Sequence, residues 1–540
     1  MSPRAFALGV DFGTESGRAL LLDLDSGEEL AVSEVAYEHG VIDRELPGTG
    51  QQLPPDWALQ HSGDWLAVLD SAIPAVLEQA PQARDAVVAL GVDFTSCTVL
   101  PVNEEGLPMF KQERWRSRRH AWPKLWKHHA AQPIADRLNE VALARGERFL
   151  ERYGGRISSE WYFPKLIELW LEDRELYDSC HGFIEATDWI VWQLTGSERR
   201  QSCTAGYKAM WSPDSGLPSR EYFEAAYPGF DTPGEKLGHE FVPLGTRAGS
   251  LTPDAAKAIG VPESVAVAVG NVDSFVSVPG CGVERPGIYV TVVGTSTCDM
   301  IVDEREVHLP GITGVLRDGI LPGLYGYEAG QTAVGDMLAW FVDTLADRSY
   351  EELEEAASKL RPGETGLLAL DWFNGNRSIL GDADLTGAIF GLTLQSSEVE
   401  IYRALLESIA FGNRRIMENF IEHGLELTEM VACGGIAERS PLIMQLLADS
   451  SGFEVHIPGS SEIPSRGSAL FGAVAAGVFE DIASAIEATR PKIARTYKPD
   501  PSAKAVYDRV YPIYRTLYET LGRSQVELLH GLKRARTNEA

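Results

Sequence analysis

The chain has 540 residues, of which 44% are hydrophobic and 23% are charged, and its formal net charge is −30. This length leaves room for two or more domains with large cores, and the composition is typical of a globular protein. The excess of acidic residues argues against a nucleic-acid-binding surface, which needs clustered Lys and Arg, and against binding to an anionic membrane.

The sequence favours a cytoplasmic location. It contains no apolar run long enough to span a bilayer, and its N-terminus leads directly into a predicted strand, so we expect no signal peptide. The six cysteines are dispersed and form no Cys-x-x-Cys pair. This spacing favours buried thiols in a reducing compartment over a disulfide framework or a zinc site.

A strand–turn–strand pattern covers residues 8–23. The first strand ends on Asp11, and a turn with two glycines and the hydroxyls of Thr14 and Ser16 follows. Glycines let backbone N–H groups approach a phosphate, hydroxyls add donors, and Asp11 can hold Mg²⁺ through water. An ordinary β-hairpin with a polar turn explains the same pattern, so a nucleotide site depends on what later segments supply.

Helical and strand patterns alternate through the next part of the chain. Residues 62–69 have helical spacing with Ser62 or Asp64 as the N-cap, and a buried strand ends on Asp93. Residues 111–180 read as helical and are rich in Trp, Arg, Lys and His. Because the chain is acidic, aromatic packing beside a polar ligand pocket is favoured there over a nucleic-acid surface.

The second half repeats the strand–turn–strand pattern of residues 8–23. Residues 287–298 form another apolar strand followed by glycine and hydroxyls, with Gly294 and Thr295 at the turn. Asp273 follows an apolar strand near the junction of the halves, where clefts usually lie, and could serve as a general base or cap a helix. The predicted division is residues 1–269, residues 270–495 and a helical tail, 496–540, packed on both.

A double glycine, Gly434-Gly435, follows a third strand of interest and precedes a helix that Ser440 can cap. Backbone without side chains at this place lets a flat adenine or ribose lie against it. A tight strand-to-helix turn is the alternative explanation.

Two phosphate-type hairpins in two halves, with an adenosine-type double glycine, resemble the actin-like ATPase superfamily. Within it the chain closely resembles the FGGY carbohydrate kinases, because residues 387–407 fit their C-terminal signature. The N-terminal signature is only loosely echoed by Lys165 and Trp170. The resemblance is strongest to the bacterial ribulokinases of this family and is carried by residues 9–18, 57–61, 91–95, 124–132, 202–209, 270–273, 326–331 and 374–378.

The resemblance implies an α/β fold in which two actin-like ATPase (ribonuclease H-like) domains flank a catalytic cleft. It also implies roles for individual residues, with Asp273 as the base that takes the proton from the terminal hydroxyl of the sugar. The sugar pocket is expected to hold Ser96, Trp126, Lys208, Asp273 and Glu328. ATP is expected to contact Thr14, Ser16, Arg18, Gly294, Thr295, Gly335, Gly434 and Gly435. Mg²⁺ is expected at Asp11 and Asp273, mainly through water.

The implied activity is ATP-dependent phosphorylation of the C5 hydroxyl of a ketopentose, above all L-ribulose to L-ribulose 5-phosphate in arabinose catabolism. The chain departs from the ribulokinase pattern at Ser96, at Ser274-Phe275 and at Ser440, which bears on sugar preference more than on catalysis. A kinase of D-ribulose, xylulose or ribitol, an actin-like ATPase that switches a partner, and an inactive sugar sensor are the alternatives. The oligomeric state stays open, with a homodimer as one candidate.

Overall fold

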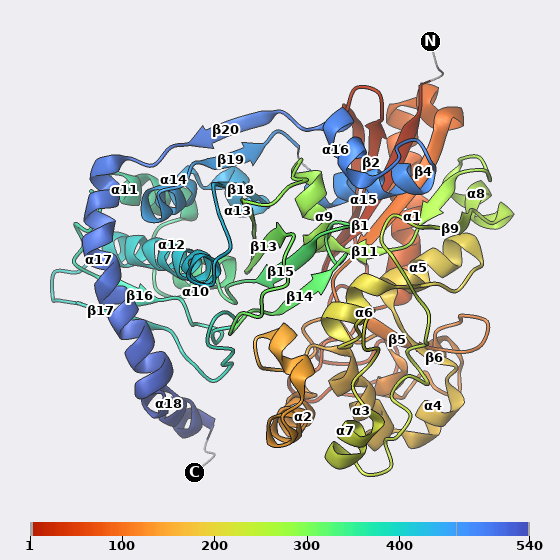
Figure 1. The fold of residues 1–540 in the computed structure, drawn as a ribbon, viewed down its shortest axis with the longest axis horizontal. Helices are drawn as coiled ribbons and strands as arrows, with labels where there is room; N and C mark the ends of the chain where they lie inside the picture. Colours follow the sequence, from red (N-terminus) through yellow and green to blue (C-terminus); the bar gives the residue numbers. More distant parts are fainter. Residues whose placement is uncertain (1–3, 461, 538–540) are drawn as a thin grey trace.

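The computed structural model describes residues 4–460 and 462–537, in which two mixed β-sheets are joined by helices (Figure 1). In the first sheet, β1 pairs antiparallel with β2 and parallel with β4, so the opening segment is a hairpin at the centre of the sheet. The strand order is β3 (Glu29–Ala36), β2 (Ser16–Asp23), β1 (Phe6–Phe12), β4 (Val87–Phe94), β10 (Ala266–Ala268) and β9 (Arg247–Ser250), with β11 (Asn271–Val272) also on β4.

The second sheet repeats this arrangement, as the sequence predicts. β12 pairs antiparallel with β13 and parallel with β18, which reproduces the pairing of β1 with β2 and β4. The strand order is β14 (Gly314–Arg317), β15 (Tyr325–Ala329), β13 (Thr297–Asp303), β12 (Ile288–Val293), β18 (Glu429–Cys433), β19 (Val455–Pro458) and β20 (Ile493–Tyr497).

The two faces of the first sheet pack against different helices, because successive side chains of a strand point to opposite faces. Leu8 and Val10 of β1 belong to the core shared with α1 and α5, whereas Ala7 belongs to the core shared with α9 and α15. These helices are α1 (Ser62–Gln79), α5 (Ala186–Thr195), α9 (Asp273–Gly280) and α15 (Ile463–Ala475).

Helix α15 approaches the first sheet so closely that only glycine fits beneath it. A Cβ atom on Gly9 would lie 1.7 Å from the carbonyl oxygen of Ser465, and one on Gly91 would lie 1.9 Å from that of Ser468. This helix lies late in the chain yet packs on β1 and β4, so it joins the two halves. The division at residue 270 stays a prediction.

A helical lobe with its own aromatic core lies beside the first sheet (Figure 1). Its helices are α2 (Gln132–Arg145), α3 (Tyr162–Glu172), α4 (Arg174–Ser179) and α7 (Arg220–Ala226). Residues 111–131 are turns and short 3₁₀ segments, so the expected helix is wrong for this part. Within this irregular segment the guanidinium groups of Arg114 and Arg118 lie 4.3 and 4.6 Å from the Trp115 ring, as cation–π contacts.

One helical face of the tail packs on the second half, as the spacing of its tyrosines predicts, whereas packing on both halves stays a prediction. Tyr507, Tyr511, Tyr514 and Tyr518 of α17 are buried in the core of the second sheet. The tail helices are α17 (Pro501–Glu519) and α18 (Glu527–Thr537). Before them in this half come α10 (Gly335–Thr344), α11 (Tyr350–Ser358), α12 (Glu398–Glu422), α13 (Gly435–Arg439), α14 (Pro441–Ser451) and α16 (Ile482–Thr489).

Ser440 caps α14 by accepting a hydrogen bond from the backbone N–H of Ile443, as the sequence predicts. All six cysteines are free thiols. Within residues 4–460 and 462–537, no helix is both long and apolar enough to cross a membrane.

Candidate active site

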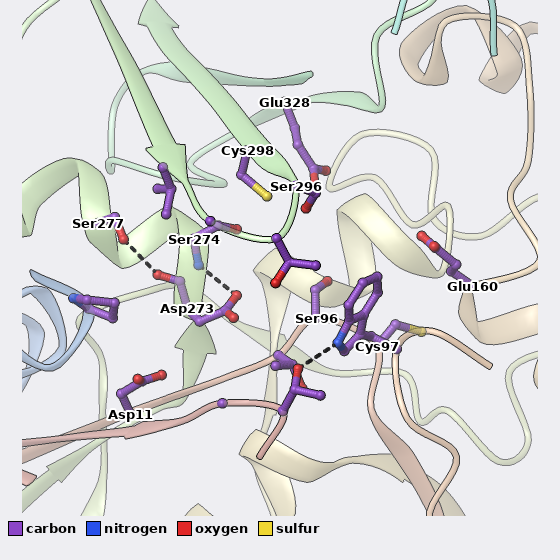
Figure 2. Close-up of a pocket in the computed structure, with 18 of the residues that line it drawn as sticks. Asp11, Ser96, Cys97, Glu160, Asp273, Ser274, Ser277, Ser296, Cys298 and Glu328 are labelled. Atoms are coloured by element: carbon purple, nitrogen blue, oxygen red, sulfur yellow. Dashed lines mark hydrogen bonds between the residues drawn. The ribbon is translucent and has the colours of Figure 1, made fainter. Parts of the chain in front are cut away.

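Three carboxyl groups meet at one edge of the first sheet (Figure 2 shows two of them). Asp11 and Asp93 are partners in the parallel pairing of β1 with β4, and Asn271 of β11 is in register with Asp93. Asp273 follows two residues later as the first residue of α9. Because parallel strands end at the same edge of a sheet, all three acids lie near one another, where open α/β sheets bind ligands.

Asp273 is the most accessible of these acids. Its carboxylate accepts a hydrogen bond from the backbone N–H of Ser274 at 2.7 Å, and its carbonyl oxygen accepts one from Ser277 Oγ at 3.1 Å (Figure 2). Burial and the negative charge of Asp11 raise the pKa of Asp273 to about 7. A carboxyl group that titrates near neutrality and faces a cavity has the properties of a general base.

Lys208 and Glu328 form a buried ion pair across the same cavity. Lys208 ends α6 (Ser202–Lys208) in the first half, Glu328 lies on β15 in the second, and their Nζ and Oε2 atoms are 2.7 Å apart. Although burial lowers the pKa of Lys208, the carboxylate of Glu328 outweighs it and raises that pKa above its ordinary value. Lys208 therefore keeps its charge, and the pair offers both donors and an acceptor to a polar ligand.

The two glycine turns are closed in a similar way. The N–H of Gly13 donates to the carbonyl of Ser16, and the N–H of Gly294 donates to that of Ser296, each at 3.0 Å. One turn comes from each sheet. Two such backbone turns that face one cavity are suited to holding a chain of phosphate groups between them.

Trp126 contacts the first turn, and Ser96 lines the same cavity. Trp126 Nε1 donates to Thr14 Oγ1 at 3.1 Å, and Gln60 Nε2 donates to the carbonyl of Thr14 at 2.8 Å. The Ser96 hydroxyl is buried and has no hydrogen-bond partner within the part of the chain described. A buried polar group without a partner is costly, which favours a ligand hydroxyl there.

Three of the glycines that are predicted to contact ATP lie beside the second turn. The N–H of Gly335 donates to the carbonyl of Gly294 at 3.1 Å. Gly434 adopts φ of 92° and caps α13, which starts at Gly435, and a Cβ on Gly434 would lie 2.7 Å from the carbonyl oxygen of Val293. At both contacts, backbone without a side chain lies next to the end of β12.

Arg18 and Ser16 both donate hydrogen bonds to the carboxylate of Glu34. The Arg18 guanidinium donates to Asp11 at 3.1 Å and to Glu34 at 2.9 Å, and Ser16 Oγ donates to Glu34 at 2.7 Å. Arg18 lines the cavity, whereas the hydroxyl of Ser16 is held by Glu34 outside the lining.

A cavity of about 420 Å³ joins these groups. The predicted site residues in its lining are Asp11, Thr14, Arg18, Ser96, Trp126, Lys208, Asp273, Gly294, Thr295 and Glu328. Those outside the lining are Ser16, Gly335, Gly434 and Gly435.

Comparison with known proteins decides the family. The profile of the FGGY family of carbohydrate kinases, N-terminal domain, matches residues 6–280, and that of the C-terminal domain matches residues 289–476. The chain belongs to the FGGY family of carbohydrate kinases. It is 47% identical to a ribulokinase of Geobacillus thermodenitrificans over 98% of this chain and 97% of that one. It is 41% identical to a ribulokinase of Mycolicibacterium smegmatis over 99% and 97%.

Solved structures of sugar kinases share the two-domain fold. The xylulose kinase of Rhodospirillum rubrum superposes with a TM-score of 0.78 at 21% identity, covering 96% of this chain and 99% of that one. The ligand-bound xylulose kinase of Lactobacillus acidophilus gives 0.79 at 17%, with the same coverage. The predicted fold class is confirmed, and membership of a carbohydrate kinase family implies ATP as the phosphoryl donor.

The cavity of this FGGY kinase also contains residues to which sequence reasoning gives no role. They are Thr95, Cys97, Glu160, Trp161, Ser277, Val292, Ser296, Cys298, Arg377 and Pro464. Arg377 lies in residues 374–378, one of the segments that carry the family resemblance, and this position could have indicated a role for it. Glu160 lies in none of those segments, and its pairing with Arg377 depends on the packing of the two halves.

The acid cluster of the kinase fits a hard divalent cation. Its donors are carboxylate oxygens, which Mg²⁺ prefers, and Asp11 and Asp273 both line the cavity. Burial and the charge of Asp11 raise the pKa of Asp93 well above its ordinary value, and Asp93 Oδ1 is buried without a hydrogen-bond partner in the described chain. Besides burial, the raised pKa reflects the negative potential of the neighbouring carboxylates, and a bound cation would offset that potential.

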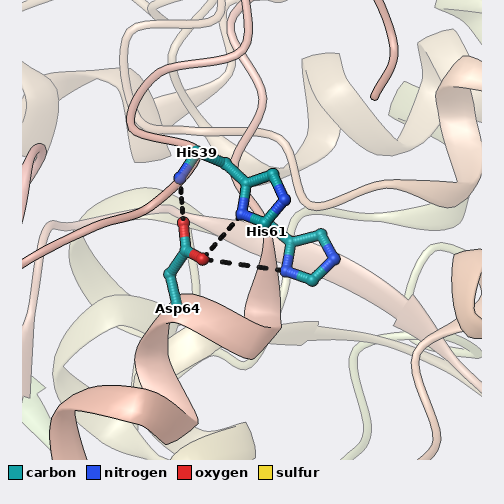
Figure 3. Close-up of side chains that lie close together, drawn as sticks. All are labelled: His39, His61 and Asp64. Carbon is teal, nitrogen blue, oxygen red and sulfur yellow. Dashed lines mark hydrogen bonds and ion pairs between the residues drawn. The ribbon is translucent and has the colours of Figure 1, made fainter. Parts of the chain in front are cut away.

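A second cluster, His39, His61 and Asp64, ties the loop after β3 to the start of α1 (Figure 3). Asp64 accepts from the backbone N–H of His39 at 3.1 Å and pairs with its Nδ1 at 2.8 Å. Burial above all lowers the pKa of His61 to about 4, so its neutral Nδ1 accepts from Gly63 at 3.1 Å. His61 therefore caps α1, and the expectation of Ser62 or Asp64 as the cap is wrong.

Proposed function

We propose that this FGGY kinase transfers the γ-phosphoryl group of ATP to the C5 hydroxyl of a ketopentose, with L-ribulose as its preferred substrate. The observation that carries the proposal is the position of Asp273, which shares one cavity with two phosphate-type turns and with the Lys208–Glu328 pair. The name ribulokinase of relatives that are 41% and 47% identical supports the choice of sugar.

Asp273 would accept the proton of the C5 hydroxyl while the new O–P bond forms and the bond to ADP breaks. The N–H of Ser274 fixes the carboxylate, and a pKa of about 7 lets it hold the proton that it receives. Because phosphoryl transfer has a loose transition state, position and charge neutralisation contribute more than early deprotonation.

The sugar would lie with its reacting hydroxyl at Asp273 and would contact the Lys208–Glu328 pair. The ammonium and carboxylate of that pair can each bond a hydroxyl, and the unpartnered hydroxyl of Ser96 supplies one further polar contact. The ring of Trp126 forms an apolar wall, which suits the C–H face of a sugar.

ATP would lie across the two glycine turns, with its phosphates at Thr14, Arg18, Gly294 and Thr295 and its adenosine at Gly434-Gly435. Gly335 supports the second turn from behind. Asp11 and Asp273 would hold Mg²⁺, mainly through water, and the ion would neutralise charge on the phosphate oxygens. Closure of the two halves over the cavity would exclude water that otherwise hydrolyses ATP.

A sugar-dependent ADP-release assay tests the proposal. The panel contains L-ribulose, D-ribulose, L-xylulose, D-xylulose, ribitol and glycerol, and we expect the highest kcat/KM with L-ribulose. A higher value with another sugar would overturn the choice of L-ribulose. ADP release that does not depend on any of these sugars would instead favour an ATPase that switches a partner.

A further inference from the structure

The cavity has a second polar end, formed by Glu160 and Arg377. Glu160 precedes α3 in the first half, and Arg377 lies in the loop after β16 (Leu368–Leu370) in the second. Figure 2 shows Glu160 on the opposite side of the cavity from Asp11 and Asp273. Arg377 Nη2 and Glu160 Oε1 are 3.9 Å apart, so the pair bridges the two halves at this end.

The protein does not fill all the hydrogen-bonding positions of either side chain. A separation of 3.9 Å is too long for a hydrogen bond, and Arg377 makes none to any residue in the described ranges. Glu160 Oε1 accepts from His129 Nε2 at 3.0 Å, while Oε2 has no hydrogen-bond partner there. Both side chains are only about one-fifth exposed, at 21% and 23%. Partly buried charges with free donor and acceptor positions favour a polar ligand between them.

The two groups have opposite hydrogen-bonding capacities. Burial would raise the pKa of Glu160, but Arg377 and His129 lower it to about 2, so the carboxylate is ionised and only accepts. The guanidinium only donates. A hydroxyl between them can accept from Arg377 and donate to Glu160, whereas a methyl group can do neither.

The order of charges along the cavity shows which part of a sugar reaches this end. In Figure 2, Glu328 lies in the middle of the view, with Asp273 to its left and Glu160 to its right, and Lys208 Nζ lies 2.7 Å from Glu328 Oε2. The Lys208–Glu328 pair therefore lies between Asp273 and the second polar end. A sugar whose reacting hydroxyl is at Asp273 extends past the pair and presents its other end to Arg377 and Glu160.

We propose that Arg377 and Glu160 together bind the C1 hydroxyl of the ketopentose and thereby select sugars that carry one. The inference rests on the proposed function, because it takes the hydroxyl at Asp273 as the one that is phosphorylated. The two residues are specificity determinants that touch the substrate. Since they come from different halves, binding of the C1 hydroxyl also favours the closed arrangement.

The test compares the best ketopentose of the panel with its 1-deoxy analogue. For the wild type we expect kcat/KM to fall about 10²-fold on loss of the C1 hydroxyl, because the site is left with unpaired polar groups. Arg377→Met and Glu160→Gln should lower kcat/KM for the parent sugar and leave the analogue nearly unchanged, which shrinks the preference to less than about 10-fold. Arg377→Lys keeps the charge without the planar fork, and we expect an intermediate preference.

Arg152→Met is the matched control. Arg152 also bridges the halves, at 3.2 Å to Glu306, and is similarly exposed, but it does not line the cavity. This variant should retain the full preference for the C1 hydroxyl. If Arg377→Met fails to fold, Glu160→Gln and Arg377→Lys carry the same comparison.

Two outcomes overturn the inference: a wild type that uses both sugars equally, or an unchanged preference in the cavity variants. Failure of the proposed function looks different. In that case the wild type phosphorylates none of the ketopentoses, and the panel assay reveals it before any variant is made.

Discussion

Lys208 and Glu328 form an ion pair at 2.7 Å although 120 residues separate them, and each comes from a different half of the kinase. Their side chains are only 7% and 8% exposed. Breaking such a pair leaves one buried charge alone, so we expect Lys208→Met or Glu328→Leu to cost about 3–5 kcal/mol of folding free energy. Denaturant unfolding measures this loss.

The double variant Lys208→Met/Glu328→Leu separates stability from activity. It removes both charges at once, so its folding free energy should recover to near that of the wild type. We expect no sugar phosphorylation by either single variant or by the double variant, because the pair also binds the substrate. Activity of the double variant at the wild-type level would exclude the pair from the sugar site.

Asp273→Asn keeps the shape of the side chain and removes its capacity to accept a proton. We expect kcat to fall by about 10²–10⁴-fold, while the dissociation constant of the sugar changes little. Stopped assays with radiolabelled ATP measure the first quantity and calorimetry the second. Near-normal turnover would remove Asp273 from the mechanism.

The raised pKa of Asp273 predicts an acid limb in the pH profile. Protonated Asp273 cannot accept the hydroxyl proton, so kcat/KM should fall as the pH drops below about 7. A nearby cation favours the ionised carboxylate, so higher Mg²⁺ should move this limb to lower pH. The residual activity of Asp273→Asn should lack the limb, and a limb that persists in this variant would assign it to another group.

Gly335→Ala tests the second phosphate turn. The added Cβ would lie 2.9 Å from the carbonyl oxygen of Gly294 and 3.2 Å from Thr295 Cα, so the turn must shift. We expect the KM for ATP to rise about 10- to 100-fold with little change in the KM for the sugar. Gly531→Ala is the control, because a Cβ there meets no atom within 4 Å. Equal effects on both KM values would argue against a specific role in nucleotide binding.

The sequence predicts those parts of the site that depend on local order. Apolar strands followed by glycines identify the turns at Gly13 and Gly294, and the acid after a strand identifies Asp273. These signals work because the side-chain period of a strand and the conformational demands of a turn are local properties.

Groups that meet only through tertiary packing leave no such signal. Lys208 and Glu328 read as solvated charges without the family resemblance, and Glu160 carries no pattern at all. The hydroxyl of Ser16 is held by Glu34, and that contact depends on the register that pairs β2 with β3, where Arg18 faces Glu34. A register of this kind is decided by the packing of the whole sheet.

The most direct test of the central claim is the position of the phosphate in the product. The kinase is incubated with ATP, Mg²⁺ and ¹³C-labelled L-ribulose, and the carbon–phosphorus couplings of the product are recorded by NMR. We expect one phosphorylated sugar, with its phosphorus coupled to C5 and to the neighbouring C4. Coupling to C1, or ATP consumption without a phosphorylated sugar, would contradict it.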